Sequence, residues 1–152
     1  MDILSKFLIQ FKKTPEHDAT QIRRRGTAIV VTKQGILLTA QKRKIFSLPG
    51  GGAHSKESRI HAAIRELREE TGLCADNVRF LFRYQGSIHV LPNGTQYRDF
   101  HTVCLVHARG VPIPKKEIKY LFFLRFGSNP KIRTNDDTKH ILEKFEKEMP
   151  QG

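Results

Sequence analysis

The stretch that decides how this chain folds is Gly51–Leu73, which reads GGAHSKESRIHAAIRELREETGL. Within it Glu66, Glu69 and Glu70 stand at i, i+3 and i+4, so on a helix their side chains share one face. Like charges at this spacing repel one another by about 0.2–0.5 kcal/mol per pair. A face of this kind predicts a cation among the carboxylate oxygens.

The same stretch predicts a two-sided helix from about Ser58 to Thr71. Ser58 is a suitable N-cap, and Gly72 is a suitable C-terminal stop. On a helical wheel, an apolar arc of about 100° lies opposite the glutamates, and its members are Ile60, Ala63, Ile64 and Leu67. One side of the helix therefore packs on the protein while the other presents carboxylates to a cleft.

The spacing also fits a known pattern, G-x5-E-x7-R-E-U-x-E-E-x-G-U, in which U is a bulky aliphatic residue. Every fixed position is filled, by Gly51, Glu57, Arg65, Glu66, Leu67, Glu69, Glu70, Gly72 and Leu73. In this stretch the chain resembles the Nudix hydrolases, which cleave nucleoside diphosphates linked to another group. The resemblance implies the α/β class and the family's α/β/α sandwich, a mixed sheet on which the box helix and a C-terminal helix pack.

The resemblance also implies a metal site and a reaction. Glu66, Glu69 and Glu70 would hold Mg²⁺, or Mn²⁺ in its place, and the Gly51 carbonyl would add a ligand. Such hard cations prefer oxygen ligands and keep part of their coordination for water and phosphate oxygens. Water would then attack phosphorus, with Glu66 or Glu70 as the general base; the sequence does not choose between these two.

Three further charged residues are expected to support the reaction. The resemblance implies that Arg65 orients Glu57, whereas helical spacing also lets Arg65 bridge Glu69 one turn on. Either contact makes Arg65 and Glu57 parts of the catalytic apparatus that position other groups. An additional acid often comes from outside the box in this family. Glu117 is the candidate here, and the alternative is a charge at a strand edge.

Candidate substrate contacts lie on both sides of the box. Lys42 and Arg43 precede it and are suited to phosphate binding, with a surface charge as the alternative. Asn135 stands where some MutT-like enzymes place a base-reading asparagine, although an Asx-type helix cap is the more common role of an asparagine at such a position. Many family members carry an acid in place of His54 and a glycine in place of Lys56. Both departures concern substrate identity rather than the metal ligands.

Elimination favours a MutT-like (deoxy)nucleoside triphosphate pyrophosphohydrolase. The segment Asp76–Leu91 lacks the proline typical of ADP-ribose hydrolases. Tyr84 comes too early, and Tyr97 too late, for the tyrosine typical of diadenosine polyphosphate hydrolases. The alternatives are a pyrophosphohydrolase of RNA 5′ ends and a Nudix module that binds nucleotide or RNA without cleaving it.

Charge is what motivates these alternatives. The net charge is +12, and basic residues gather at 23–25, at 42–44 and at 115–119. Such clusters attract a polyanionic substrate or nucleic acid, or they are simply a solvated basic surface. Aromatic residues are not interleaved with them as they are in many proteins that bind single strands.

The 152 residues are expected to form one Nudix domain over 22–150, preceded by an amphipathic helix and linker over 1–21. The apolar face of that helix would consist of Ile3, Leu4, Phe7, Leu8 and Phe11. There is no apolar run of membrane-spanning length and no small-residue cleavage site near the start, so a cytoplasmic location is expected. The oligomeric state stays open, with a homodimer among the options.

The remaining elements follow from residue patterns. Strands are expected over 27–32, 36–39, 78–90, 97–108 and 117–126, and a final helix capped by Asp136 or Asp137. The apolar stripe of that helix comprises Ile141, Leu142, Phe145 and Met149. His101 and Cys104 resemble an H-x-x-C metal pair, but an odd separation on a strand directs them to opposite faces.

Overall fold

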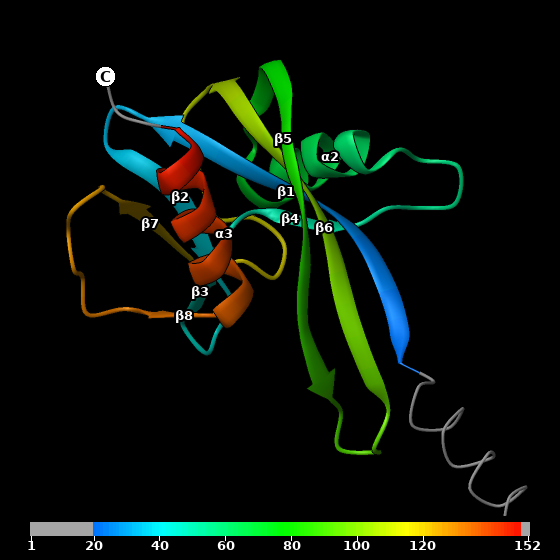
Figure 1. The fold of residues 1–152 in the computed structure, drawn as a ribbon. Coiled ribbons are helices and arrows are strands. Elements are labelled where there is room, and N and C mark those ends of the chain that lie inside the picture. Colours follow the sequence, from blue (N-terminus) through cyan, green and yellow to red (C-terminus); the bar gives the residue numbers. More distant parts are fainter. Residues whose placement is uncertain (1–19, 150–152) are drawn as a thin grey trace, which may run out of the picture.

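The computed structural model describes residues 20–149, which form a sheet of eight strands with two helices (Figure 1). The elements in chain order are β1 (Gln21–Thr32), β2 (Gly35–Ala40), β3 (Ile45–Ser47), β4 (Gly50–Gly52), α2 (Arg59–Thr71), β5 (Cys74–Val90), β6 (Gln96–Arg109), β7 (Tyr120–Leu124), β8 (Arg133–Thr134) and α3 (Asp136–Glu148). The amphipathic helix predicted over 1–21 lies outside the described residues. In the range 20–149, no helix has the length and apolar character needed to cross a membrane.

The strand β1 joins the two halves of the sheet. Residues 21–30 pair in parallel with β6, residues 25–27 pair with β4, and residues 31–32 pair with β2. The sheet order is β5-β6-β1-β2-β3-β8, with β4 added to β1 and β7 added to β2. Two parallel pairs, β1–β6 and β3–β8, stand among antiparallel neighbours, so the sheet is mixed as expected.

The two helices cover opposite faces of this sheet. On one face, Ala63 and Leu67 of α2 pack against the core residues Ala28, Val30, Cys104 and Val106. On the other, Ile141 and Phe145 of α3 pack against Ile29, Phe82 and Val103. Full burial of each large side chain stabilises the fold by about 1.5–3 kcal/mol. The α/β/α sandwich is therefore confirmed (Figure 1).

A close approach of backbones fixes α2 on the sheet. A Cβ atom added at Gly26 of β1 would lie 1.9 Å from the Arg59 carbonyl oxygen and 2.5 Å from the Ala63 nitrogen. The helix begins after the N-cap Ser58 and ends at Gly72, whose φ of 78° is left-handed. Both predicted ends are confirmed, and the contact at Gly26 sets where the carboxylate face points.

Four predicted boundaries are wrong. β5 starts at Cys74 rather than at Val78. β1 starts at Gln21 rather than Thr27, because its polar first half pairs with β6 and does not need apolar side chains. β7 is shorter than the predicted 117–126 strand, so Glu117 lies in the preceding loop. α3 is capped by Asn135 and not by either aspartate; its predicted stripe is otherwise confirmed, with Ile141 and Phe145 buried.

Candidate active site

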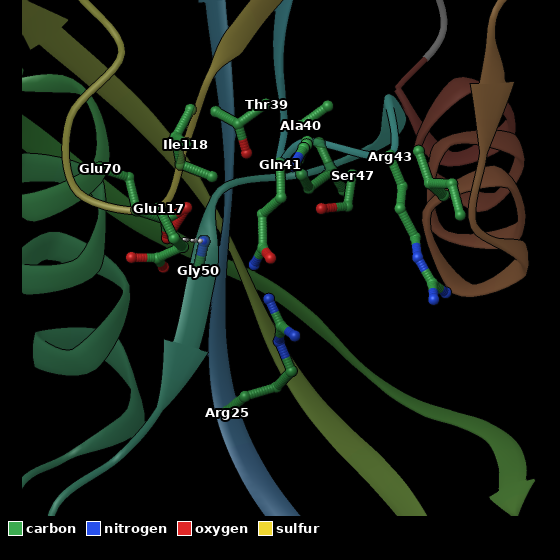
Figure 2. A pocket seen from close by; sticks show the side chains of 13 residues that line it. Arg25, Thr39, Ala40, Gln41, Arg43, Ser47, Gly50, Glu70, Glu117 and Ile118 are labelled. Atoms are coloured by element: carbon green, nitrogen blue, oxygen red, sulfur yellow. Dashed lines mark hydrogen bonds between the residues drawn. The ribbon is translucent and has the colours of Figure 1, made fainter. Parts of the chain in front are cut away.

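A cleft of ≈ 500 Å³ opens where the C-terminal half of α2 meets the ends of β2 and β4 (Figure 2). Glu70 and Gly50 form part of its wall, where the Glu70 carboxylate accepts a hydrogen bond from the Gly50 N–H at 3.2 Å. The other charged residues that line the cleft are Arg25, Lys42, Arg43 and Glu117. The structure thus brings two predicted acids and two predicted phosphate contacts into one cavity.

Glu70 is the most buried of the box glutamates, with 5% of its surface exposed. Burial raises its pKa from the ordinary 4.5 to about 8, against the opposing effect of the Gly50 N–H. The charges of Glu66 and Glu117 raise it further, whereas that of Arg25 lowers it. A carboxylate in such surroundings needs a proton or a cation to balance its charge.

Glu117 reaches this wall because its loop is tied to the end of α2. The Lys115 N–H donates to the Glu70 carbonyl at 2.9 Å, and the Ile113 N–H donates to the Thr71 carbonyl at 3.0 Å. These two bonds satisfy carbonyls that the helix end leaves free. The sequence offered Glu117 as a candidate for a further acid beside the box, and the structure places it in the cleft with Glu70.

Arg65 links Glu57, Glu66 and Glu69, the three box glutamates that are not among the residues lining the cleft. Its guanidinium donates twice to Glu57, at 2.8 and 3.0 Å, and once each to Glu66 at 2.9 Å and Glu69 at 3.1 Å. A further bond at 3.0 Å goes to the Gly52 carbonyl. The two contacts that the sequence offered as alternatives, to Glu57 and to Glu69, are both made.

Contacts with Arg65 and Lys116 also set the charge state of Glu57 and Glu69. The hydrogen bonds from Arg65 and the His54 N–H lower the pKa of Glu57 from 4.5 to about 2. The ammonium of Lys116, 2.9 Å from Glu69, lowers the pKa of that carboxyl, and Arg65 adds to the effect. Glu57 and Glu69 are therefore held as anions at neutral pH, in contrast to Glu70.

Glycine is required at Gly50 and Gly51 because neighbouring atoms leave no room for a side chain there. A Cβ atom on Gly51 would lie 2.5 Å from the Cδ of Glu66. A Cβ atom on Gly50, whose φ is 155°, would lie 2.2 Å from the Gly26 carbonyl oxygen. The backbone around Gly51 thus passes directly over the Glu66 carboxylate. That approach is compatible with its predicted role as a carbonyl ligand beside Glu66.

Cationic side chains line the cleft together with Glu70 and Glu117. They are Lys42 and Arg43, which the sequence offered as candidate phosphate contacts, and Arg25, which the sequence placed only in a general basic cluster. Figure 2 shows Arg25 and Arg43. The Arg25 Nε is buried without a hydrogen-bond partner within the described residues, and its Nη1 lies 3.8 Å from Asp99. The signal that would have found it is strand alternation, since Arg25 shares a face with the core residue Ile29.

A second acidic group satisfies the spacing for a metal better than the box does. Within residues 20–149, the ligand atoms of Asp99, His101 and Asp137 lie within 4.8 Å of one another, whereas the box glutamates do not form such a set. However, Asp99 already accepts two bonds from Arg23, at 2.8 and 3.1 Å. His101 uses both ring nitrogens, with Thr27 at 2.8 Å and Asp137 at 2.9 Å. Charge balance therefore favours the box as the cation site.

The sequence did not indicate the buried network of hydrogen bonds around His101, which includes Thr27, Asp137 and Ser87. Burial is the main cause that lowers the pKa of His101, so its ring is neutral at neutral pH. The neutral ring then donates from Nε2 to Asp137 and accepts the Thr27 hydroxyl at Nδ1. Asp137 also accepts the Ser87 N–H at 3.1 Å, so the network holds α3 against β1, β5 and β6. As predicted, His101 and Cys104 point to opposite faces, and both are buried.

Asn135 and Lys56 have clear local roles. The Asn135 Oδ1 accepts the Thr138 N–H at 2.7 Å as the cap of α3, and Asn135 is not among the residues that line the cleft. Its predicted contact with a base stays a prediction. Lys56 adopts a left-handed φ of 68°, which is the backbone conformation that the family's glycine would adopt without strain.

Comparison with known proteins agrees with the fold and with the box. The family model described as NUDIX domain matches residues 22–147. A nudix hydrolase family member from Chromobacterium violaceum has 31% sequence identity, covers 84% of this chain and 78% of its own, and gives a TM-score of 0.65. The MutT NUDIX hydrolase from Burkholderia pseudomallei has 26% identity over 81% of this chain and 97% of its own, also at 0.65.

A third structure, the E. coli ORF135 protein, has 22% identity over 84% of this chain and 91% of its own, with a TM-score of 0.65, and supports the fold alone. The family model spans both helices and nearly all of the described residues. On these matches the chain belongs to the Nudix family and is a Nudix hydrolase.

Proposed function

We propose that the cleft hydrolyses a diphosphate bond in a nucleoside triphosphate, as a MutT-like pyrophosphohydrolase that depends on Mg²⁺. The observation that carries this proposal is the opposition of charges within one cavity. Glu70 and Glu117 line the cavity together with Lys42, Arg43 and Arg25. A polyphosphate with its cation satisfies both sets of charges at once, whereas a neutral substrate satisfies neither.

In this proposal Glu66, Glu69 and Glu70 hold the cation together with the Gly51 carbonyl. Their fit is supported by the unbalanced burial of Glu70 and by the close approach of Gly51 to Glu66. The cation supplies charge neutralisation of the diphosphate and lowers the pKa of a bound water. Nudix hydrolases generally use a divalent metal, and the carboxylate oxygens here are of the type that Mg²⁺ prefers.

The residues of the chain account for the remaining steps. Lys42, Arg43 and Arg25 bind the phosphates and align them along the cleft, which converts the attack of water into an oriented reaction. Glu66 or Glu70 accepts the proton of the attacking water. Arg65 holds Glu57 and the neighbouring carboxylates in place by four hydrogen bonds, so that the acids do not separate under their mutual repulsion.

The proposal is tested by a screen of substrates with separation of products. The substrates are canonical and oxidised nucleoside triphosphates, nucleotide sugars, dinucleoside polyphosphates and 5′-triphosphorylated RNA, each with and without Mg²⁺. We expect a nucleoside monophosphate and pyrophosphate from a free triphosphate, only when Mg²⁺ is present. Turnover confined to triphosphorylated RNA, or RNA binding without any turnover, would replace this proposal with one of the two alternatives.

A further inference from the structure

Residues 22–26 of β1 and their partners on β6 and β5 form a basic surface on the α2 side of the sheet, next to the first residue of that helix. It consists of three rows across β1, β6 and β5, set by the strand register: Gly26–Thr102–Arg83, Arg24–Phe100–Gln85 and Ile22–Arg98–Ile88. Residues paired across strands share a face, and so do residues two apart. Because Gly26 contacts the backbone of Arg59, this is the α2 face. We call these nine residues together with Arg59 the arginine face.

The arginine face contains no acidic residue. Among the ion pairs and side-chain hydrogen bonds within residues 20–149, none involves the guanidinium of Arg24, Arg59, Arg83 or Arg98. The Nε of Arg98 is moreover buried without a hydrogen-bond partner. The opposite face differs, since Arg23 and Arg25 there lie beside Asp99 at 2.8 and 3.8 Å. On one side β1 thus presents arginines that lie beside the Asp99 carboxylate, and on the other side an arginine, Arg24, with no acidic partner among the described residues.

A groove lies within this surface. Its volume is ≈ 390 Å³, and it is lined by Arg24, Arg59, Arg83, Tyr84, Gln85, Phe100, His101 and Thr102. Adjacent strands lie about 4.8 Å apart, so Arg24 and Arg83 flank Phe100 from its two neighbouring strands. Phe100 is one of the lining residues and is partly buried.

The helix end adds positive charge to the same groove. Arg59 is the first residue of α2, and the first turn has no acidic residue. A cation there opposes the helix dipole, which favours anions at this end. Three arginines therefore line a groove beside the first residue of α2, and no acidic residue is among its lining residues. Features that break local electrostatic rules in this way are expected where a ligand supplies the missing charge.

We propose that the arginine face binds single-stranded nucleic acid, with its phosphates at Arg24, Arg59, Arg83 and Arg98 and one base stacked on Phe100. Arginines that track a backbone around an aromatic ring are the usual means of binding single strands without strong sequence preference. The place of the partly buried Phe100 in a groove favours an unpaired base, because bases stacked inside a duplex, or the surface of a bilayer, do not enter a groove of this size. The surface lies outside the acidic cleft, so this proposal does not depend on which nucleotide the cleft hydrolyses.

The experiment titrates the full chain into a labelled twelve-nucleotide single-stranded RNA and measures fluorescence anisotropy. The same titration is made with a duplex of equal length. Anionic phosphatidylserine vesicles are then added as a competitor for the single strand. We expect the Arg24→Ala/Arg83→Ala variant to bind the single strand at least tenfold more weakly than the wild-type protein. Each phosphate contact contributes about 0.7 to the logarithmic salt slope, so loss of two contacts should reduce that slope by about 1.4. Phe100→Leu should weaken binding by about tenfold and leave the salt slope unchanged.

Matched controls remove the same charge and the same ring elsewhere. Lys33→Ala/Arg125→Ala removes two exposed cations away from the arginine face; Lys33 directly follows the end of β1, about 30 Å from Arg24 along the strand direction. Phe126→Leu removes another partly exposed ring. Thermal melting checks that all variants are folded. The proposal is overturned if the wild-type protein does not bind the single strand, if duplex or vesicles bind as tightly, or if the controls lose as much affinity as the test variants.

Discussion

Two groups of acidic side chains, built from different parts of the chain, differ in how their charge is balanced. In the box, Glu70 is buried beside Glu66 and Glu117, and its pKa rises to about 8. In the second group, burial raises the pKa of Asp99, but the hydrogen bond from Arg23 and the charge of Arg25 outweigh burial, so that this pKa lies below its ordinary value. Short distances between ligand atoms are found in the second group, yet unbalanced charge is found in the first.

The difference shows that proximity of carboxylates does not by itself indicate a cation site. Asp99, His101 and Asp137 are close together because arginines and hydrogen bonds allow it, and their lone pairs are already in use. The box glutamates do not form such a close set; Arg65 and Lys116 oppose the repulsion among Glu57, Glu66 and Glu69, whereas Glu70 has no salt bridge among the described residues. We therefore assign a structural role to the buried group and a chemical role to the box, and four predictions test that division.

The largest effect is expected at the box. Glu69→Gln and Glu70→Gln should each lower metal-dependent turnover by about a thousandfold, because a ligand or the general base is lost. In Glu70→Gln the new amide oxygen can still accept the Gly50 N–H, so thermal stability should be retained.

The opposite result is expected for Asp137→Asn in the buried group. This change places an amide near the donors His101 and Ser87 and should cost about 1–3 kcal/mol of stability, but it should leave the turnover of folded protein intact. Steady-state kinetics and thermal melting, with Glu146→Gln as the control, distinguish the two. A Glu70→Gln variant with wild-type turnover would refute the role given to the box.

A smaller loss of activity is expected when Arg65 is replaced. Arg65→Lys keeps the charge but cannot make the paired bonds to Glu57 together with those to Glu66 and Glu69. We expect turnover to fall by about 10–100-fold, as for other residues that orient metal ligands. Arg68→Lys on the exposed side of the same helix is the control and should have no effect. Equal activity of both variants would show that the acids do not need Arg65.

The stability of the buried group should depend on pH through His101. Its pKa is lowered from 6.5 by burial and by Arg25, against the hydrogen bond and charge of Asp137 and the charge of Asp99. The Tyr84 ring lies 6.0 Å from the imidazole between centroids, tilted by 54°. The folded state therefore binds this proton less readily than the unfolded chain, so stability is present above pH 6.5 and is lost as pH falls below it. His101→Gln should reduce the difference in melting temperature between pH 7 and pH 5. Exposed His107→Gln should leave it unchanged, and a similar change in both variants would argue against the network.

The smallest effect is expected at the start of α3. Asn135→Ala removes the acceptor of the Thr138 N–H and should cost about 1 kcal/mol, or about 3 °C in melting temperature for a domain of this size. Asn135→Asp retains the cap and should be close to wild type in stability. Kinetics with a nucleoside triphosphate then test the second interpretation of this residue. If Asn135 reads a base, both variants raise KM, and if it is only a cap, neither does.

The box helix could be predicted from the sequence because its signals are local. Ser58, Gly72 and the two arcs of the helical wheel act within one element, and the structure has them as predicted. The α/β/α arrangement could be predicted only through the family resemblance. The first half of β1 was missed because Arg23, Arg24 and Arg25 carry no apolar alternation. Pairing with β6, which is distant in sequence, makes that segment a strand.

The site was predictable in part for the same reason. Residues within the box have fixed spacing, so Arg65, Glu66 and Glu70 could be proposed from it. Arg25 and the network around His101 depend on which residues the sheet register places side by side, and nothing local indicates that register. Glu117 was proposed through the family resemblance, and the hydrogen bonds from its loop to the end of α2 explain its position.

The most direct measurement is the binding of Mn²⁺, followed by water proton relaxation, to the wild-type protein, Glu70→Gln and His101→Gln. Our account predicts that the wild-type protein binds Mn²⁺, that Glu70→Gln loses this binding, and that His101→Gln retains it. Loss of binding in His101→Gln with retention in Glu70→Gln would contradict the account and place the cation at Asp99, His101 and Asp137 instead.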